Sequence, residues 1–177
     1  MSYLSVDETL AQKKEIKKKV YKGLSLKYPS KKPLISIIAD GELSESELAL
    51  IRGLNEAGKD IDVDFLILAE SGFDGCSRFQ FVPYNLGNRE MVLEASDFVL
   101  AFKFNDIEEI MMHGAVPICK NRAEVENYDA QTEKGNAFIY KNDTVFSVFE
   151  ASVRAIETYK FPWDFKHIVR TGMKIGV

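Results

Sequence analysis

Short apolar runs alternate along the chain with segments in which apolar residues recur every three or four positions. The clearest run, Leu34-Ile-Ser-Ile-Ile-Ala39, is rich in β-branched residues and typical of a strand covered on both faces. Strands that alternate with amphipathic helices favour a parallel sheet with right-handed crossovers. The pattern therefore predicts an α/β fold with one mainly parallel sheet and helices on both faces. The predicted strands span residues 34–39, 63–69, 79–82, 98–102, 115–119 and 137–140.

Capping signals mark the helices between these strands. Ser5-x-x-Glu8 and Ser44-x-x-Glu47 are capping boxes, which predict helices over about 6–21 and from 45 to a stop at Gly58. Other helices are expected to begin after Asn85, Asp106, Thr144 and Phe161, and the last is expected to end near residue 170. Gly114 supplies the turn that ends the helix after Asp106.

The first predicted helix has a thin apolar stripe and an unusual number of lysines. Ile16 and Val20 are expected to pack on the domain. The lysines are expected to form a solvated face, although such a cluster also attracts anions or an acidic partner. The predicted organisation is a helix and connector over residues 1–30, followed by a Rossmann-like domain over 31–177. The lysines concerned are Lys13, Lys14, Lys17, Lys18 and Lys19.

Length, charge and cysteine content limit the kinds of protein that this chain can be. A chain of 177 residues fits one domain and is long enough to bury a core. Its formal charge of -4 argues against a nucleic-acid partner. No apolar run is long enough to span a bilayer and the amino terminus lacks an export core, so no membrane partner and a cytoplasmic location are expected. Cys76 and Cys119 have no metal-site spacing and form no disulfide framework, and Cys119 is expected in the core.

Two segments carry a family resemblance. The run Glu109-Ile-Met-Met-His-Gly-Ala-Val-Pro-Ile118 resembles E-A-M-R-Y-G-T-V-P-I of bacterial glycogen and starch synthases. The run Asn127-Tyr-Asp-Ala-Gln-Thr-Glu-Lys-Gly-Asn-Ala-Phe138 resembles their D-Y-D-P-E-T-G-E-G-N-G-F. Those enzymes are two-domain glycosyltransferases of the GT-B type. The resemblance implies their carboxy-terminal, sugar-nucleotide half, whose inherited activity would be transfer of glucose from ADP-glucose to an α-1,4-glucan.

Four positions match nucleotide-binding residues of that family. Tyr84 stands thirteen residues before Asp97, as does the family tyrosine that lies against the base. Glu109 matches the glutamate that faces the ribose, and Gly135 and Asn136 match the G-N of the second motif. Each has a simpler interpretation: an aromatic residue packed at a strand end, a solvated carboxylate, and a turn before a strand.

The family's phosphate-binding segments are altered in this chain. Its G-R-L-x-x-Q-K-G motif corresponds to Ala39-Asp-Gly-Glu-Leu-Ser-Glu-Ser46, which is acidic where cations are needed. Asp97 and Glu109 are twelve positions apart, against seventeen in the family, so the glycine turn that presents amides to the phosphates is missing. The T-G-G-L-A-D-T-V loop is replaced by the shorter Asn121-Arg-Ala-Glu-Val125.

These departures predict a transferase-like domain that is inactive as this chain and binds ADP-glucose or another nucleotide weakly. The absence of an acceptor-binding domain points the same way, although enzyme status stays open. The alternatives are a non-catalytic module that binds a protein partner or forms a homodimer, and a domain that binds another anion at the carboxyl ends of the strands. No catalytic residue, metal or cofactor is assigned. His113 and His167 have no partners that complete a triad, so each is expected to be a surface or half-buried histidine.

Overall fold

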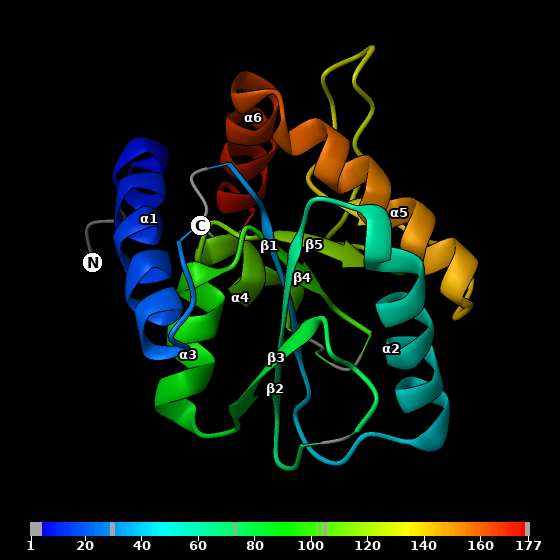
Figure 1. Ribbon diagram of the computed structural model, residues 1–177. Helices are drawn as coiled ribbons and strands as arrows, with labels where there is room; N and C mark the ends of the chain where they lie inside the picture. The colour runs from blue at the N-terminus through cyan, green and yellow to red at the C-terminus, as the bar shows by residue number, and fades with distance from the viewer. Residues whose placement is uncertain (1–4, 29–30, 73, 103, 105, 176–177) are drawn as a thin grey trace.

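The computed structural model describes residues 5–28, 31–72, 74–102, 104 and 106–175 (Figure 1). Six strands form one sheet in the order β3-β2-β1-β4-β5-β6, and all neighbouring strands are parallel. The predicted single parallel sheet is therefore confirmed, although five strands are one or two residues shorter than expected and β3 is one residue longer. The strands are β1 Leu34–Ile38, β2 Asp64–Ala69, β3 Phe79–Pro83, β4 Phe98–Leu100, β5 Val116–Cys119 and β6 Phe138–Ile139.

Helices cover both faces of this sheet. One face packs against α2, α5 and α6, and the other against α1, α3 and α4. Figure 1 shows α2 and α5 together on one side of the strands and α1 with α3 on the other. No helix in the described part of the chain has the length and apolar character needed to cross a membrane. The helices are α1 Val6–Gly23, α2 Glu45–Ala57, the short 3-10 helix η1 Gly58–Asp60, α3 Leu86–Ala95, α4 Ile107–Met112, α5 Val145–Tyr159 and α6 Pro162–Met173.

The central strand β1 shows why the sequence forms this architecture. Ile35 and Ile37 point into the core beneath α2 and α5, whereas Leu34 and Ile38 point into the core beneath α1 and α3. All four are at most 2% exposed. Burying each such side chain stabilises the fold by about 1.5–3 kcal/mol. A strand buried on both faces has no polar face, so its sequence is a nearly continuous apolar run, interrupted in β1 by the buried Ser36.

The predicted caps are present. Ser5 and Ser44 form complete capping boxes with Glu8 and Glu47. Side chains also cap α3, α4 and α5, and Gly58 is the C-cap of α2. The three caps are Asn85, Asp106 and Thr144.

Two lysines of α1 correct the expected solvated face. Lys13 and Lys17 are buried, on the same face of the helix as Val20. The Lys13 ammonium donates hydrogen bonds to the carbonyl oxygens of Glu94 at 2.9 Å and Ser96 at 2.7 Å, at the end of α3. A cation is stabilised at a helix carboxyl terminus, where carbonyl groups lack partners within the helix. The solvated-face prediction was wrong for these two lysines.

The rest of the α1 prediction is confirmed. Val20 is buried and Ile16 is partly buried against the core. Lys14, Lys18 and Lys19 are exposed, as expected. Sequence spacing alone did not separate the two buried lysines from their solvated neighbours, because their acceptors lie some 80 residues away in the chain.

Candidate functional site at the carboxyl edge of the sheet

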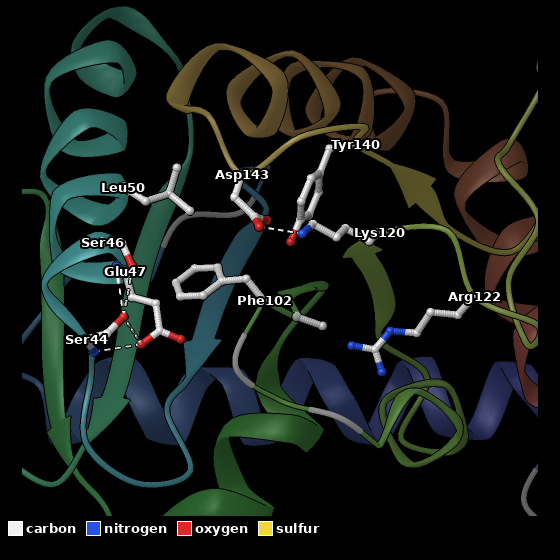
Figure 2. A pocket seen from close by; sticks show the side chains of 10 residues that line it. Ser44, Ser46, Glu47, Leu50, Phe102, Lys120, Arg122, Tyr140 and Asp143 are labelled. Carbon is white, nitrogen blue, oxygen red and sulfur yellow. Dashed lines mark hydrogen bonds and ion pairs between the residues drawn. The ribbon is translucent and has the colours of Figure 1, made fainter.

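A hollow of about 220 Å³ lies at the carboxyl ends of the strands, between the start of α2 and the segments after β4, β5 and β6 (Figure 2). The strand order changes direction between β1 and β4, and ligands in open α/β sheets bind outside such switch points. The hollow is therefore the candidate site. Its lining consists of Ser44, Ser46, Glu47, Leu50, Ala101, Phe102, Lys120, Arg122, Tyr140 and Asp143.

The amino terminus of α2 forms one wall of the hollow, and the Glu47 carboxylate takes part in its capping box. The Glu47 carboxylate accepts hydrogen bonds from the Ser44 backbone amide at 2.7 Å and the Ser44 hydroxyl at 2.8 Å. The Glu47 amide donates in return to the Ser44 hydroxyl oxygen at 3.3 Å. Helix amino termini commonly bind phosphate through such amides and the helix dipole. Here the Glu47 carboxylate lies beside that terminus, bonded to the Ser44 amide and hydroxyl, and adds a negative charge there.

The opposite wall combines charged and aromatic side chains. Lys120, after β5, forms an ion pair with Asp143, after β6. Tyr140 is 2% exposed, and burial, with a further contribution from Asp143, raises the pKa of its hydroxyl. Figure 2 shows the rings of Phe102 and Tyr140 lying on either side of the Lys120–Asp143 pair, and Arg122 reaching toward the same space.

A second polar cluster lies at the same edge, on the side of α3 and α4. The Tyr84 hydroxyl donates to Asp40 Oδ1 at 3.2 Å, which joins the ends of β3 and β1. Burial, and then Asp40, raise the pKa of the Tyr84 hydroxyl. Arg89 of α3 makes a two-pronged pair with Glu109 of α4, with Nη1 at 2.7 Å from Oε1 and Nη2 bonded to Oε2. This hydrogen bonding raises the pKa of Arg89, whose guanidinium also lies 4.9 Å from the centre of the Phe104 ring.

The four residues expected from the family resemblance fall into two groups. Tyr84 and Glu109 lie in the cluster just described. Gly135 and Asn136 lie instead in the loop between β5 and β6, and neither lines the hollow. Gly135 has a φ of +108°, and a Cβ there would lie 2.5 Å from Tyr128 Cα.

Asn136 holds that loop together. It is 2% exposed, donates to the Glu124 carbonyl at 3.0 Å and accepts from the Glu126 amide at 2.7 Å. Its amide also contacts Met111 Sδ at 3.4 Å. These contacts suit a residue that fixes the shape of the loop.

The remaining candidate residues, His113, His167 and Cys119, do not form a second catalytic or metal-binding site with other described residues. His113 caps the end of α4, where burial lowers its pKa, and His167 stacks on Trp163 with ring centroids 5.4 Å apart. Cys119 is buried as expected, and burial raises its pKa to about 11. The described residues contain no group of three or more His, Cys, Asp or Glu side chains that could hold a metal ion.

Sequence reasoning missed the polar residues that shape the hollow and its neighbouring cluster. Lys120, Tyr140 and Asp143 each end or follow a predicted strand, and all three meet because the strands are parallel neighbours. Arg89 lies on a predicted helix with no motif around it. Position relative to the carboxyl end of each strand was the signal that could have identified the first three.

Comparisons with known proteins place the chain beside glycosyltransferases. No protein-family model matches it. The glycogen synthase of Exiguobacterium sibiricum is 24% identical over 136 residues, which covers 65% of this chain and 28% of the synthase.

Solved structures show the same fold. The catalytic domain of starch synthase IV from Arabidopsis thaliana, solved with ADP and acarbose, superposes with a TM-score of 0.78 at 19% identity, over 96% of this chain and 40% of that one. Anabaena HepE, solved with UDP and glucose, superposes with a TM-score of 0.66 at 13% identity, over 92% of this chain and 47% of that one. The chain thus spans less than half the length of each of these proteins. Its sequence is similar to glycogen synthase, and its fold is that of the Rossmann-like carboxy-terminal half of GT-B glycosyltransferases.

Proposed function

We propose that this chain is a glycosyltransferase-related domain of the ADP-glucose-binding type that has lost glucosyl transfer. The similarity to glycogen synthase supports the origin of the domain. The loss is supported chiefly by one observation: the Glu47 carboxylate lies at the amino terminus of α2, bonded to the amide and hydroxyl of its N-cap residue, Ser44. A diphosphate bound at that terminus would have to displace this carboxylate, or sit beside its charge.

The cations at the edge strengthen this argument. Lys120 pairs with Asp143, and Arg89 pairs with Glu109. A sugar-nucleotide transferase must stabilise the negative charge that builds on its leaving group, which requires donors aimed at the phosphates. Each charge-assisted hydrogen bond contributes roughly 1.5–3 kcal/mol. Loss of two such contacts weakens binding by roughly a hundredfold or more.

Any remaining affinity for a nucleotide would come from the polar cluster of Tyr84, Arg89 and Glu109. Tyr84 and Glu109 would face the base and the ribose, as the family resemblance implies. Arg89 would hold the Glu109 carboxylate in a fixed orientation through its two hydrogen bonds. Gly135 and Asn136 would contribute indirectly, by shaping the loop before β6.

Calorimetric titration with ADP and ADP-glucose, together with a glucan-elongation assay, tests the proposal. We expect no elongation, and dissociation constants no tighter than about 1 mM, a binding free energy of roughly -4 kcal/mol. Tyr84→Ala is the informative variant, and Tyr28→Ala is its control, because Tyr28 is also partly buried but packs on Tyr21 of α1, away from the cluster. Micromolar binding that Tyr84→Ala abolishes would show that the nucleotide site is intact. Measurable elongation would overturn the proposed loss of activity.

A role in binding a protein partner is a second candidate, favoured by exposed aromatic side chains. Phe161 and Trp163, where α6 begins, are 60% and 59% exposed. Large exposed aromatic groups are common at protein interfaces. Sedimentation analysis of the chain and of a Phe161→Ser/Trp163→Ser variant tests self-association through this surface. A monomer at all concentrations would leave only a different protein as the partner.

A further inference from the structure

We propose that a pocket at the amino edge of the sheet binds a small α-amino acid with an apolar side chain, of the size of leucine. The pocket lies between the carboxyl end of α1, with the turn after it, and the amino ends of β1, β2 and β3. The candidate site described above lies at the opposite edge, so the inference does not depend on the proposed function. Three properties of the pocket carry it: a small apolar interior, two neighbouring opposite charges, and a lysine at the rim.

The interior of the pocket is small and mainly aliphatic. Its volume is about 140 Å³. An engineered apolar cavity of about 150 Å³ in another protein binds benzene, so a space of this size accepts one ring or one short branched chain. A nucleotide exceeds it. The aliphatic side chains of the lining are Val20, Leu24, Leu26, Leu34 and Leu66, of which Val20, Leu34 and Leu66 are at most 3% exposed.

Asp64 and Arg78 place opposite charges beside each other in this pocket. Asp64 begins β2, and Arg78 directly precedes β3. The residues that follow them, Phe65 and Phe79, are partners in the parallel register. Asp64 and Arg78 therefore occupy neighbouring positions on adjacent strands, and both line the pocket.

Both charged groups keep hydrogen-bonding capacity for a ligand. Asp64 Oδ2 accepts from the Tyr21 hydroxyl at 2.6 Å, and a carboxylate accepts more than one hydrogen bond. The Arg78 guanidinium donates to the carbonyl oxygens of Lys59, Ile61 and Val63 at 3.1–3.2 Å, and it has further N–H donors. These hydrogen bonds hold the two side chains in place. A ligand therefore meets an acceptor and a donor that are already oriented.

An α-amino acid matches this arrangement, because its ammonium and carboxylate groups are attached to one carbon atom. The ammonium would donate to Asp64 and the carboxylate would accept from Arg78. Lys27, exposed and part of the lining, supplies a second cation for the carboxylate. With its charged groups at the rim, the ligand would direct an apolar side chain into the aliphatic interior, where burial stabilises the complex.

Ligands with a single charge fit less well. An amine without a carboxylate would bring a positive charge beside Arg78 and Lys27. A carboxylate without an amine would bring a negative charge beside Asp64. Like charges repel, so each of these ligands loses one attraction and meets one repulsion. The zwitterion meets neither mismatch.

Titration of the isotope-labelled chain with L-leucine, followed by amide NMR, tests the inference. The matched probes are 3-methylbutylamine, which lacks the carboxylate, and 4-methylpentanoate, which lacks the ammonium, because both keep the isobutyl group. Glycine lacks that group and tests the apolar interior. We expect leucine to shift amides near Leu24, Asp64 and Arg78. It should bind at least about tenfold more tightly than each probe, the effect of one charge-assisted hydrogen bond or of one buried aliphatic group.

Two charge variants supply independent arms. Asp64→Asn keeps an oxygen that accepts from the Tyr21 hydroxyl, and it should weaken leucine binding about tenfold without weakening 4-methylpentanoate binding. Its control is Asp62→Asn, because Asp62 is exposed and lies outside the lining. Lys27→Met should weaken leucine binding about two- to fivefold, the effect of one exposed ion pair. Its control is Lys31→Met, at an exposed position outside the lining.

Amide spectra and melting temperatures show whether each variant is folded, and Lys27→Met changes only an exposed side chain, so it serves even where Asp64→Asn does not fold. The inference is overturned if leucine produces no localised shifts, or if either single-charge probe or glycine binds as tightly as leucine. Unchanged leucine binding by folded Asp64→Asn would also overturn it. The result for ADP-glucose does not bear on this pocket, because the two edges of the sheet are tested by separate ligands.

Discussion

Lys17 and Asp97 form an ion pair that is shielded from solvent, with only 4% and 5% of their side chains exposed. The Asp97 carboxylate also accepts a hydrogen bond from the Leu34 amide at 2.7 Å, and Lys17 donates to the Lys32 carbonyl at 2.9 Å. The pair therefore joins α1 to the amino ends of β1 and β4. The first helix is attached to the sheet edge opposite the candidate site.

Removing one member of this pair should be costly. Lys17→Met keeps the apolar stem of the side chain but leaves the Asp97 charge buried without its cation. Such a change typically destabilises a protein by about 3–5 kcal/mol. Urea denaturation measures the loss, and exposed Lys14→Met is the control with an expected effect within about 0.5 kcal/mol.

A second variant separates charge from packing. Adding Asp97→Asn to Lys17→Met removes the unpaired charge while keeping an acceptor for the Leu34 amide. The double variant should be more stable than Lys17→Met alone. A double variant that loses the sum of the two single effects would show that the ion pair is not the source of the destabilisation.

Lys13 gives the unfolding free energy a dependence on pH. Burial lowers its pKa in the folded chain to about 8, from an ordinary value of 10.5. Between these values the unfolded chain binds more protons than the folded chain, so stability should rise with pH, by at most about 1.4 kcal/mol per pH unit. Below pH 8 both states hold the proton and this contribution is flat.

The comparison of Lys13→Met with the unaltered chain at pH 7 and pH 9.5 isolates this effect. The unaltered chain should gain stability relative to Lys13→Met as the pH rises, whereas its difference from Lys14→Met should stay constant. Working below pH 10 avoids the buried tyrosines, whose raised pKa values affect stability only at higher pH. A constant difference for Lys13→Met would mean that its ammonium keeps an ordinary pKa in the folded chain.

Lys13 and Lys17 show where prediction from local sequence pattern fails. The strands follow from β-branched runs, and the helix starts follow from capping residues within one turn, so both are readable from neighbouring positions. The burial of Lys13 and Lys17 depends on acceptors at Glu94, Ser96 and Asp97, which the fold brings to α1 from far along the chain. When the hydrogen-bond acceptors of such lysines lie far along the chain, local sequence pattern predicts a solvated helix face.

The candidate site also contains residues that local sequence predicts and residues that only the fold brings together. Tyr84 and Glu109 were identified because a family motif surrounds them, and the fold places them at one edge of the sheet, where Arg89 bonds to Glu109. The hollow lined by Lys120, Tyr140 and Asp143 has no motif and arises only when β4, β5 and β6 are aligned side by side. Its paired charges depend on side-chain geometry that spacing does not encode.

Gly135→Ala should destabilise the loop before β6. The substitution combines a backbone conformation that alanine avoids, at φ +108°, with a Cβ 2.6 Å from the Asn127 carbonyl oxygen. The conformational cost alone is about 1–3 kcal/mol. Gly75→Ala is the matched control, because Gly75 has a φ of +85° but no atom within 4 Å of its added Cβ. Thermal denaturation should show a larger loss for Gly135→Ala, and equal losses would exclude a role for the close approach.

The electrostatic basis of the proposed function predicts that Glu47→Gln should bind ADP more tightly than the unaltered chain. Glutamine retains an oxygen that accepts from the Ser44 amide, as Glu47 does at 2.7 Å, so the capping box is kept while one negative charge is removed. Repulsion between unit charges 4 Å apart amounts to about 1 kcal/mol even in water, which corresponds to a gain of about fivefold in affinity.

Exposed Glu45→Gln, in the same first turn but outside the lining, is the control and should gain less. The gain for Glu47→Gln should shrink in high salt, because the charges are partly open to solvent. Calorimetric titration of the three proteins at low and high ionic strength measures both effects. Equal affinities for Glu47→Gln and the unaltered chain would show that the internal carboxylate is not what excludes the diphosphate. The shortened loops after β4 and β5 would then be the remaining cause.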